Sequence, residues 1–226
     1  MAKKPTYSER LWPDTPEFNS LLSKWNSSSS VVLLTFVWKG YDIFCQEVLS
    51  NVDCSQSDED LERNITQLFE PRIRQAMTGD EPFYLQHSPY EQETRKKSPA
   101  QPPQYDIAFV WRSNPRIMWP LEAKVLKTET TMTEYVKEIK NNFLTCRYAP
   151  FSNEGGMLGY LLEGTPENVF KNICKKLKCK LRHHTEFKER HHKISKHQRQ
   201  VPQSKNYSHL FCCHHMILNI QKIMPS

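Results

Sequence analysis

The stretch that decides the fold is Tyr105-Asp106-Ile107-Ala108-Phe109-Val110-Trp111, followed after Arg112-Ser113-Asn114-Pro115 by Ile117-Met118-Trp119-Pro120-Leu121-Glu122-Ala123-Lys124-Val125. Both runs are rich in residues that favour β-strands, and the residues between them have the composition of a turn. The pattern predicts an antiparallel hairpin centred on Asn114, in which Asp106 lies opposite Glu122. Because side chains alternate along a strand, Lys124 shares the face of Glu122. The other face is almost entirely apolar: Ile107, Phe109, Trp111, Ile117, Trp119, Leu121, Ala123 and Val125.

Asp106, Glu122 and Lys124 place two carboxylates and one ammonium on an otherwise apolar hairpin. Carboxylates at cross-strand spacing, roughly 4.5–5.5 Å between Cβ atoms, raise each other's pKa unless a cation lies between them. Such oxygen ligands suit Mg²⁺, which binds one or two carboxylates together with substrate phosphate. A lysine beside the metal can orient a water or stabilise charge on phosphorus. The sequence therefore predicts metal-assisted phosphodiester hydrolysis. The alternative is that these charges are ordinary pairs on a solvated sheet face.

These residues resemble the motif of the PD-(D/E)xK nuclease superfamily, in which an aspartate strand precedes a strand carrying Glu-x-Lys. The resemblance extends from about Asp58 to Thr165, and one departure is that Tyr105 stands where the proline of the motif would precede Asp106. It implies an α/β fold with a restriction-endonuclease-like mixed β-sheet core flanked by helices, here with an N-terminal helical extension. It also implies that Asp106, Glu122 and the Ala123 carbonyl bind Mg²⁺ or Mn²⁺, with Lys124 assisting the attacking water. The implied function is a metal-dependent DNA endonuclease, of the kind used in defence against phage.

A helix is predicted between Ser57 and Gly79. Ser57 with Asp60 resembles a capping arrangement, and helical spacing continues through Leu61, Ile65, Leu68, Phe69 and Ile73. In the superfamily such a helix often supplies one more acidic residue, so the resemblance makes Glu62 a candidate catalytic residue, with Glu70 as the second choice. The alternative is that acidic residues simply favour the first turn, near the positive end of the helix dipole.

The remaining elements follow from hydrophobic spacing and turn signals. We predict helices over 17–25 and 31–49, a strand over 83–85, a polar surface loop over 87–104, a helix over 131–144 capped by Thr131, a buried parallel strand over 156–162, a helix from Pro166 and a strand over 212–217. The order strand, strand, strand, helix, strand is that of the superfamily core. The chain divides into an N-terminal helical segment, 1–56, and a nuclease core, 57–226.

The segment 171–205 is strongly basic. It holds twelve Lys and Arg residues against two glutamates, a net charge of +10, which leaves −4 for the rest of a chain of net charge +6. Such a block is typical of a surface that holds the phosphate backbone of nucleic acid, and DNA is preferred to RNA on the resemblance. The alternatives are a solvated tail or a contact with an acidic protein. The candidate nucleic-acid-binding residues are Lys171, Lys175, Lys176, Lys178, Lys180, Arg182, Lys188, Arg190, Lys193, Lys196 and Arg199.

The same region is rich in histidine and cysteine, which are common ligands of structural zinc sites. Cys174 and Cys179 only border the spacing of structural zinc sites, and Cys212-Cys213-His214-His215 are consecutive. On a strand, consecutive residues face opposite ways, so this composition favours extra hydrogen-bond donors near phosphate over a structural zinc site. A zinc-stabilised adaptor remains an alternative.

Composition excludes several other classes. The few glycines form no phosphate-binding loop motif, and seven cysteines at irregular spacings favour reduced thiols over a disulfide framework. The first residues are polar and charged, so neither a signal peptide nor membrane association is expected, and the expected location is the cytoplasm. Double-strand cleavage would favour a homodimer by symmetry or a partner defence subunit. The competing function is a non-catalytic nucleic-acid-binding module.

Overall fold

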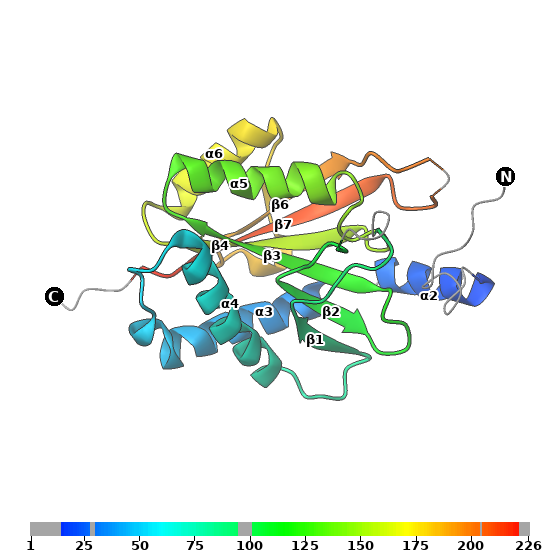
Figure 1. Cartoon of the computed structure of the whole chain (residues 1–226), viewed down its shortest axis with the longest axis horizontal. Helices are drawn as coiled ribbons and strands as arrows, with labels where there is room; N and C mark the ends of the chain where they lie inside the picture. Colours follow the sequence, from blue (N-terminus) through cyan, green and yellow to red (C-terminus); the bar gives the residue numbers. More distant parts are fainter. Residues whose placement is uncertain (1–14, 28–29, 95–100, 204, 222–226) are drawn as a thin grey trace.

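The computed structural model of the chain is a mixed seven-stranded β-sheet with helices on both faces (Figure 1). It describes residues 15–27, 30–94, 101–203 and 205–221. The strand order is β1-β2-β3-β4-β7-β6-β5. The strands are β1 (Phe83–His87), β2 (Ile107–Trp111), β3 (Met118–Leu126), β4 (Glu154–Leu161), β5 (Arg182–His183), β6 (His192–Gln198) and β7 (Leu210–Asn219). The predicted α/β class with a mixed sheet flanked by helices is confirmed.

Strands β2 and β3 form the predicted hairpin in the predicted register. Ile107 lies opposite Leu121 and Phe109 opposite Trp119, and the next step of the same register brings Asp106 opposite Glu122. β1 pairs antiparallel with β2, whereas β4 lies parallel to both β3 and β7. A parallel strand in the interior of a sheet is buried on both faces, which explains why the predicted strand over 156–162 is almost continuously apolar.

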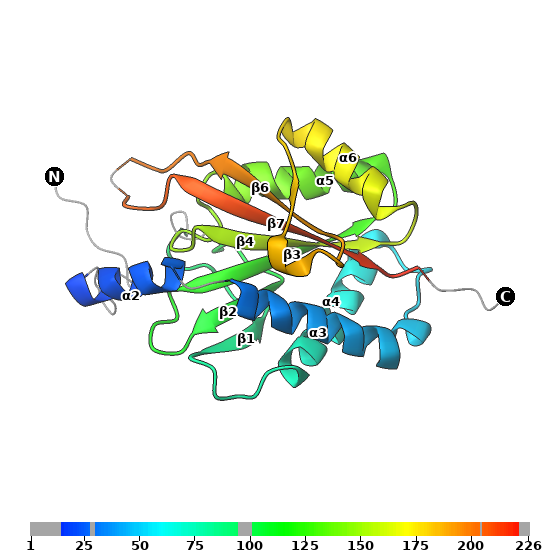
Figure 2. The same ribbon diagram turned by 180° about the vertical axis from the view of Figure 1, so that it is seen from behind.

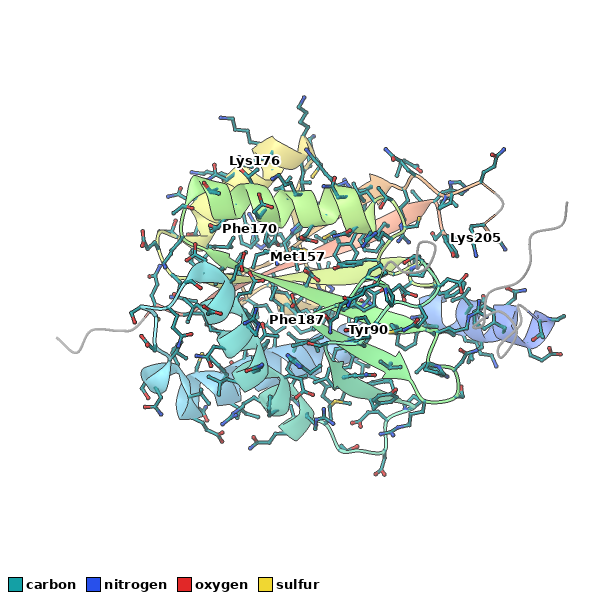
Figure 3. All side chains as sticks on the ribbon, viewed as in Figure 1. Tyr90, Met157, Phe170, Lys176, Phe187 and Lys205 are labelled. Atoms are coloured by element: carbon teal, nitrogen blue, oxygen red, sulfur yellow. The ribbon has the colours of Figure 1, made fainter. Side chains whose placement is uncertain are left out.

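Two hydrophobic clusters hold the helices against the sheet. The helices on one side are α2 (Pro16–Ser27), α3 (Val31–Glu47) and α4 (Asp58–Gln75), and those on the other are α5 (Glu129–Glu138) and α6 (Pro166–Leu177) (Figures 1 and 2). The apolar face of the hairpin belongs to the first cluster, which it shares with Leu34, Phe44 and Ile65. Met157 on β4 packs in the second cluster and lies in the interior (Figure 3).

Helix α4 is positioned by its cap and by a close approach to α3. The side chain of Ser57 accepts a hydrogen bond from the N–H of Asp60, as the sequence predicts. Gly40 of α3 lies against α4, where a Cβ atom would come within 2.7 Å of the backbone of Ile73. Residues of both predicted segments, 1–56 and 57–226, therefore share one core, while the boundary itself stays a prediction.

Within the described residues, no helix is both long enough and apolar enough to cross a bilayer.

Several local predictions are wrong. Thr128, not Thr131, caps α5, because the two threonines exchange hydrogen bonds in a capping box; after Glu138 the chain continues as a π-helix, η2 (Ile139–Phe143). Helix α4 ends at Gln75, before Gly79.

The sequence predicts that the polar segment after β1 is a solvated surface loop, but two of its charged residues are buried. Glu91 and Glu93 are buried, because the hydroxyl of Tyr105 donates to Glu91 and the guanidinium of Arg116 pairs with Glu93 at 3.1 Å.

Candidate active site

The candidate site lies where β3 continues past the end of β2. The last β2 pairing is that of Ile107 with Leu121, whereas β3 runs on to Leu126. Two backbone N–H groups on that edge of β3 bind carboxylates instead of a neighbouring strand. The N–H of Ala123 donates to Oδ2 of Asp106 at 2.7 Å, and the N–H of Val125 donates to Oε2 of Glu62 at 3.2 Å. Because β2 ends there, the edge of β3 is free to bind two acidic side chains, Asp106 from the residue before β2 and Glu62 from α4.

Lys124 forms ion pairs with two of the acidic residues. Its Nζ atom lies 2.8 Å from Oε1 of Glu62 and 3.6 Å from Oε1 of Glu122. The charge of Asp106 also acts on Lys124, so three carboxylates from β3, from helix α4 and from the residue before β2 surround one ammonium group. With all four groups ionised, this set carries an excess of two negative charges.

Glu122 is the most buried member, with 6% of its surface exposed. Its Oε2 atom is buried and has no hydrogen-bond partner among the described residues. Burial and the neighbouring charge of Asp106 raise the pKa of Glu122 well above its ordinary value, although Lys124 acts against them. An unpartnered carboxylate oxygen in an uncompensated acidic cluster is what a hard divalent cation binds, so the donor set fits Mg²⁺ or Mn²⁺.

The same burial acts on the pKa values of the other members of the site. Desolvation raises the pKa of Asp106, against the opposing effects of Lys124 and the Ala123 N–H. Desolvation likewise raises the pKa of Glu62, against Lys124. Burial alone would lower the pKa of Lys124, but the charges of Glu122, Glu62 and Asp106 outweigh it and hold that pKa above its ordinary value. Lys124 is therefore an ammonium ion at neutral pH.

The site also contains groups that the sequence did not reveal. Burial raises the pKa of both Glu122 and Tyr148, and Glu138 on α5 lies close enough to both for its charge to add to that effect. Glu138 lies three residues after the buried Tyr135, so a charged residue next to the apolar stripe of α5 was the available signal. Glu70, the second acidic candidate on α4, instead pairs with Arg74 of the same helix.

The three carboxylates do not form one compact ligand set. Within the described residues, Glu62, Asp106 and Glu122 are not among the groups whose ligand atoms all lie within 4.8 Å of one another. Glu62 instead contacts Lys124, so it holds the lysine, whereas Asp106 and Glu122 remain the candidates for metal ligands. The N–H and C=O of a residue point to the same edge of a strand, which places the Ala123 carbonyl on the edge where its N–H meets Asp106.

Most of the predicted basic residues lie on the surface. Seven are exposed: Lys171, Lys175, Lys178, Lys180, Arg182, Lys188 and Lys196. Three are half-buried with a partner of their own: the Nζ of Lys176, on α6 (Figure 3), donates to Thr133, Arg190 pairs with Asp42 at 2.7 Å, and Lys193 lies over the ring of Phe170.

Arg199 corrects the predicted nucleic-acid surface. It is 5% exposed, and its guanidinium donates to the carbonyl oxygens of Phe143, Ala149, Ser152 and Tyr148 at 2.6–3.1 Å. The prediction that Arg199 contacts a phosphate backbone is therefore wrong. Its charge is used to hold the connection between η2 and β4, where Cys146 and Ala149 have positive φ angles.

Comparison with protein-family models, with curated proteins and with solved structures finds no match for this chain.

Proposed function

We propose that this protein is a metal-dependent nuclease that hydrolyses phosphodiester bonds, with DNA as the preferred substrate. The observation that carries the proposal is the convergence of Glu62, Asp106, Glu122 and Lys124 at the free edge of β3, where the buried Oε2 of Glu122 has no hydrogen-bond partner in the described part of the chain. A group of charges this costly to bury is expected where chemistry needs it. The order α4, β1, β2, β3, α5, β4 supports a restriction-endonuclease-like core.

Each side chain has a separate part in the proposed reaction. Asp106 and Glu122, with the Ala123 carbonyl, would hold Mg²⁺ or Mn²⁺, which supplies charge neutralisation at the phosphate and activation of water. Lys124, kept as an ammonium ion by its acidic neighbours, stabilises the negative charge that develops on the phosphoryl oxygens. Glu62 orients Lys124 through the contact at 2.8 Å and is a positioning residue.

The exposed lysines and arginines of the basic segment would hold the nucleic-acid backbone by counterion release. A homodimer or a partner subunit would suit double-strand cleavage, and defence against foreign DNA would be a suitable role.

The test is to incubate the purified protein with supercoiled plasmid, linear DNA and RNA, each with Mg²⁺, Mn²⁺ or EDTA. We expect cleavage that needs the metal and that is lost in Asp106→Ala, Glu122→Ala and Lys124→Ala while these variants remain folded. Lys127→Ala is the matched control, because Lys127 also pairs with an acidic residue of α4, Asp58 at 3.0 Å. Salt-sensitive binding of DNA with no metal-dependent product would instead support a non-catalytic binding module.

A further inference from the structure

A second cluster of ligand-type side chains lies on the face of the sheet covered by α3. Cys212 and His214 are two residues apart on β7 and so share a face, and Glu154 of the neighbouring β4 pairs with Cys212. One ligand atom from each of the three lies within 4.8 Å of the others. The alternation along Cys212-Cys213-His214-His215 thus selects two ligands for one face, and the parallel partner strand supplies the third.

We propose that Glu154, Cys212 and His214 bind a zinc ion or a similar borderline divalent cation. Zinc prefers thiolate, imidazole and carboxylate ligands at about 2.0–2.3 Å, so two ligand atoms of a tetrahedral site lie about 3.3–3.8 Å apart. Nε2 of His214 is already 3.4 Å from Oε2 of Glu154. Small side-chain movements would close the set around the metal. This proposal does not rest on the proposed nuclease, whose strand residues Glu122 and Lys124 lie on the opposite face of the sheet.

The three ligands border a hollow of about 640 Å³, which His184 and Lys196 also line. A zinc ion held by three protein ligands has a fourth position for water or an external ligand, the pattern of reactive rather than purely structural zinc sites. β4, β7 and β6, which carry half of the residues lining this hollow, are neighbours in the sheet (Figure 2).

A chain of hydrogen bonds next to the site fixes which ring nitrogen of each histidine carries the proton when no metal is bound. The indole N–H of Trp38 can only donate, so Nδ1 of His192 accepts it at 3.2 Å. A neutral His192 then carries its proton on Nε2 and donates to Nδ1 of His214 at 3.1 Å. The proton of a neutral His214 is left on Nε2, where it faces Glu154. The chain therefore runs from Trp38 through both histidines to the carboxylate.

Binding of zinc to Nε2 of His214 would reverse the direction of the hydrogen bond between the two histidines. Because the metal takes the Nε2 lone pair of a neutral imidazole, the proton of His214 moves to Nδ1 and donates to Nε2 of His192. The proton of His192 then moves to Nδ1, where it opposes the indole N–H. Each histidine keeps one proton, and the only proton released comes from the thiol of Cys212. One hydrogen bond is weak beside a set of metal bonds, so we infer that zinc breaks the contact between Trp38 and His192.

The first experiment titrates the full chain with Co²⁺, a spectroscopic substitute for zinc, and then with Zn²⁺. We expect one Co²⁺ per chain, a thiolate-to-cobalt charge-transfer band, and loss of the band when zinc displaces cobalt. Cys212→Ser should abolish the band. Glu154→Gln and His214→Gln should weaken zinc binding by more than the about 10–100-fold that removal of an outer partner causes.

The matched controls are Cys54→Ser and His209→Gln, a half-buried thiol and an exposed imidazole that do not line the hollow, and both should bind as the wild type does. Absence of the band in the folded wild type, or its persistence in Cys212→Ser, would overturn the proposal.

The second experiment reads the predicted reversal directly. We expect zinc to shift the indole N–H resonance of Trp38, identified by its absence in Trp38→Phe. Trp38→Phe should also bind zinc more tightly, by a few-fold to about tenfold, because the competing hydrogen bond is no longer there. Bound zinc with an unmoved Trp38 resonance would overturn the predicted reversal of the hydrogen-bond chain.

Discussion

The carboxylate of Asp106 accepts a hydrogen bond at 2.7 Å from the backbone N–H of Ala123, the residue between Glu122 and Lys124. This bond takes the place of a strand pairing at the point where β2 ends, and so fixes the carboxylate beside Glu122. Strand geometry thereby positions an acidic group whose charge the fold itself disfavours.

The first prediction concerns Asp106→Asn. The amide oxygen of asparagine can still accept the N–H of Ala123, while the charge that adds to the effect of burial in raising the pKa of Glu122 is removed. We expect the metal-free variant to be as stable as the wild type or more stable, with cleavage abolished. Saturating Mg²⁺ should raise the melting temperature of the wild type and not that of the variant, because only a ligand that prefers the folded state stabilises it. Equal Mg²⁺ stabilisation of both proteins would contradict the metal assignment.

The second prediction concerns Lys124→Met. Removing the ammonium leaves Glu62 and Glu122 buried without their cation, and breaking a buried ion pair costs about 3 kcal/mol or more. We expect this loss in urea unfolding without metal, together with loss of cleavage. Because a divalent cation can replace part of the missing charge, Mg²⁺ should restore more stability to the variant than it adds to the wild type. Lys127→Met serves as the comparison, since Lys127 and Asp58 are more exposed.

The third prediction concerns Glu62→Gln. Glutamine can accept from the N–H of Val125 but cannot supply the charge that orients Lys124. We expect cleavage to fall by about 10–100-fold, the usual effect of losing an outer partner, with the KM for DNA little changed. Glu59→Gln, an exposed acidic residue one turn earlier in α4, should cleave normally. A variant with full activity would remove Glu62 from the site.

The fourth prediction separates Arg199 from the surface residues. Arg199→Met leaves four carbonyl groups without their donor, and we expect unfolding to become easier by about 3 kcal/mol or more. The exposed Arg182→Gln should leave stability unchanged and reduce the slope of log affinity for duplex DNA against log salt by about 0.9. Denaturant unfolding and a salt series of DNA binding measure the two effects.

The fifth prediction is acid destabilisation through His215. This buried imidazole lies 3.0 Å from the hydroxyl of Tyr135 and 2.7 Å from that of Ser195, and burial lowers its pKa from 6.5 to about 3. The unfolded chain takes up a proton as pH falls through 6.5, but the folded chain does not. The stability is therefore present above that pH and falls towards about pH 3, by up to about 1.4 kcal/mol per pH unit.

Urea unfolding between about pH 5 and about pH 7 checks this dependence. In His215→Gln, the pH dependence of the free energy of unfolding should be weaker by the uptake of about one proton, whatever the overall stability of the variant. The same slope in both proteins would show that His215 is not the titrating group.

Local pattern was enough to predict the hairpin. Alternating apolar residues and the turn at Arg112-Ser113-Asn114-Pro115 set both the pairing and the register, because a one-residue slip of one strand would put its charged side chains on the apolar face of the other. Capping chemistry likewise placed Ser57 at the start of α4. The N-cap of α5 was predicted three residues too late, since Thr128 and Thr131 offer similar caps and only the reciprocal hydrogen bonds decide between them.

The sequence by itself determined the mixed sheet, the shared face of Asp106, Glu122 and Lys124, and the apolar face opposite, because strand periodicity is local. The resemblance offered both Glu62 and Glu70 of α4, and only the tertiary structure decided for Glu62, which contacts Lys124. The tertiary structure alone also decided the approach of Glu138 from α5, the burial of Arg199, and the meeting of Glu154 with Cys212 and His214. These contacts depend on how helices pack and which strands become neighbours. No spacing along the chain encodes that, because residues far apart in sequence are brought together only by the burial of shared apolar surface.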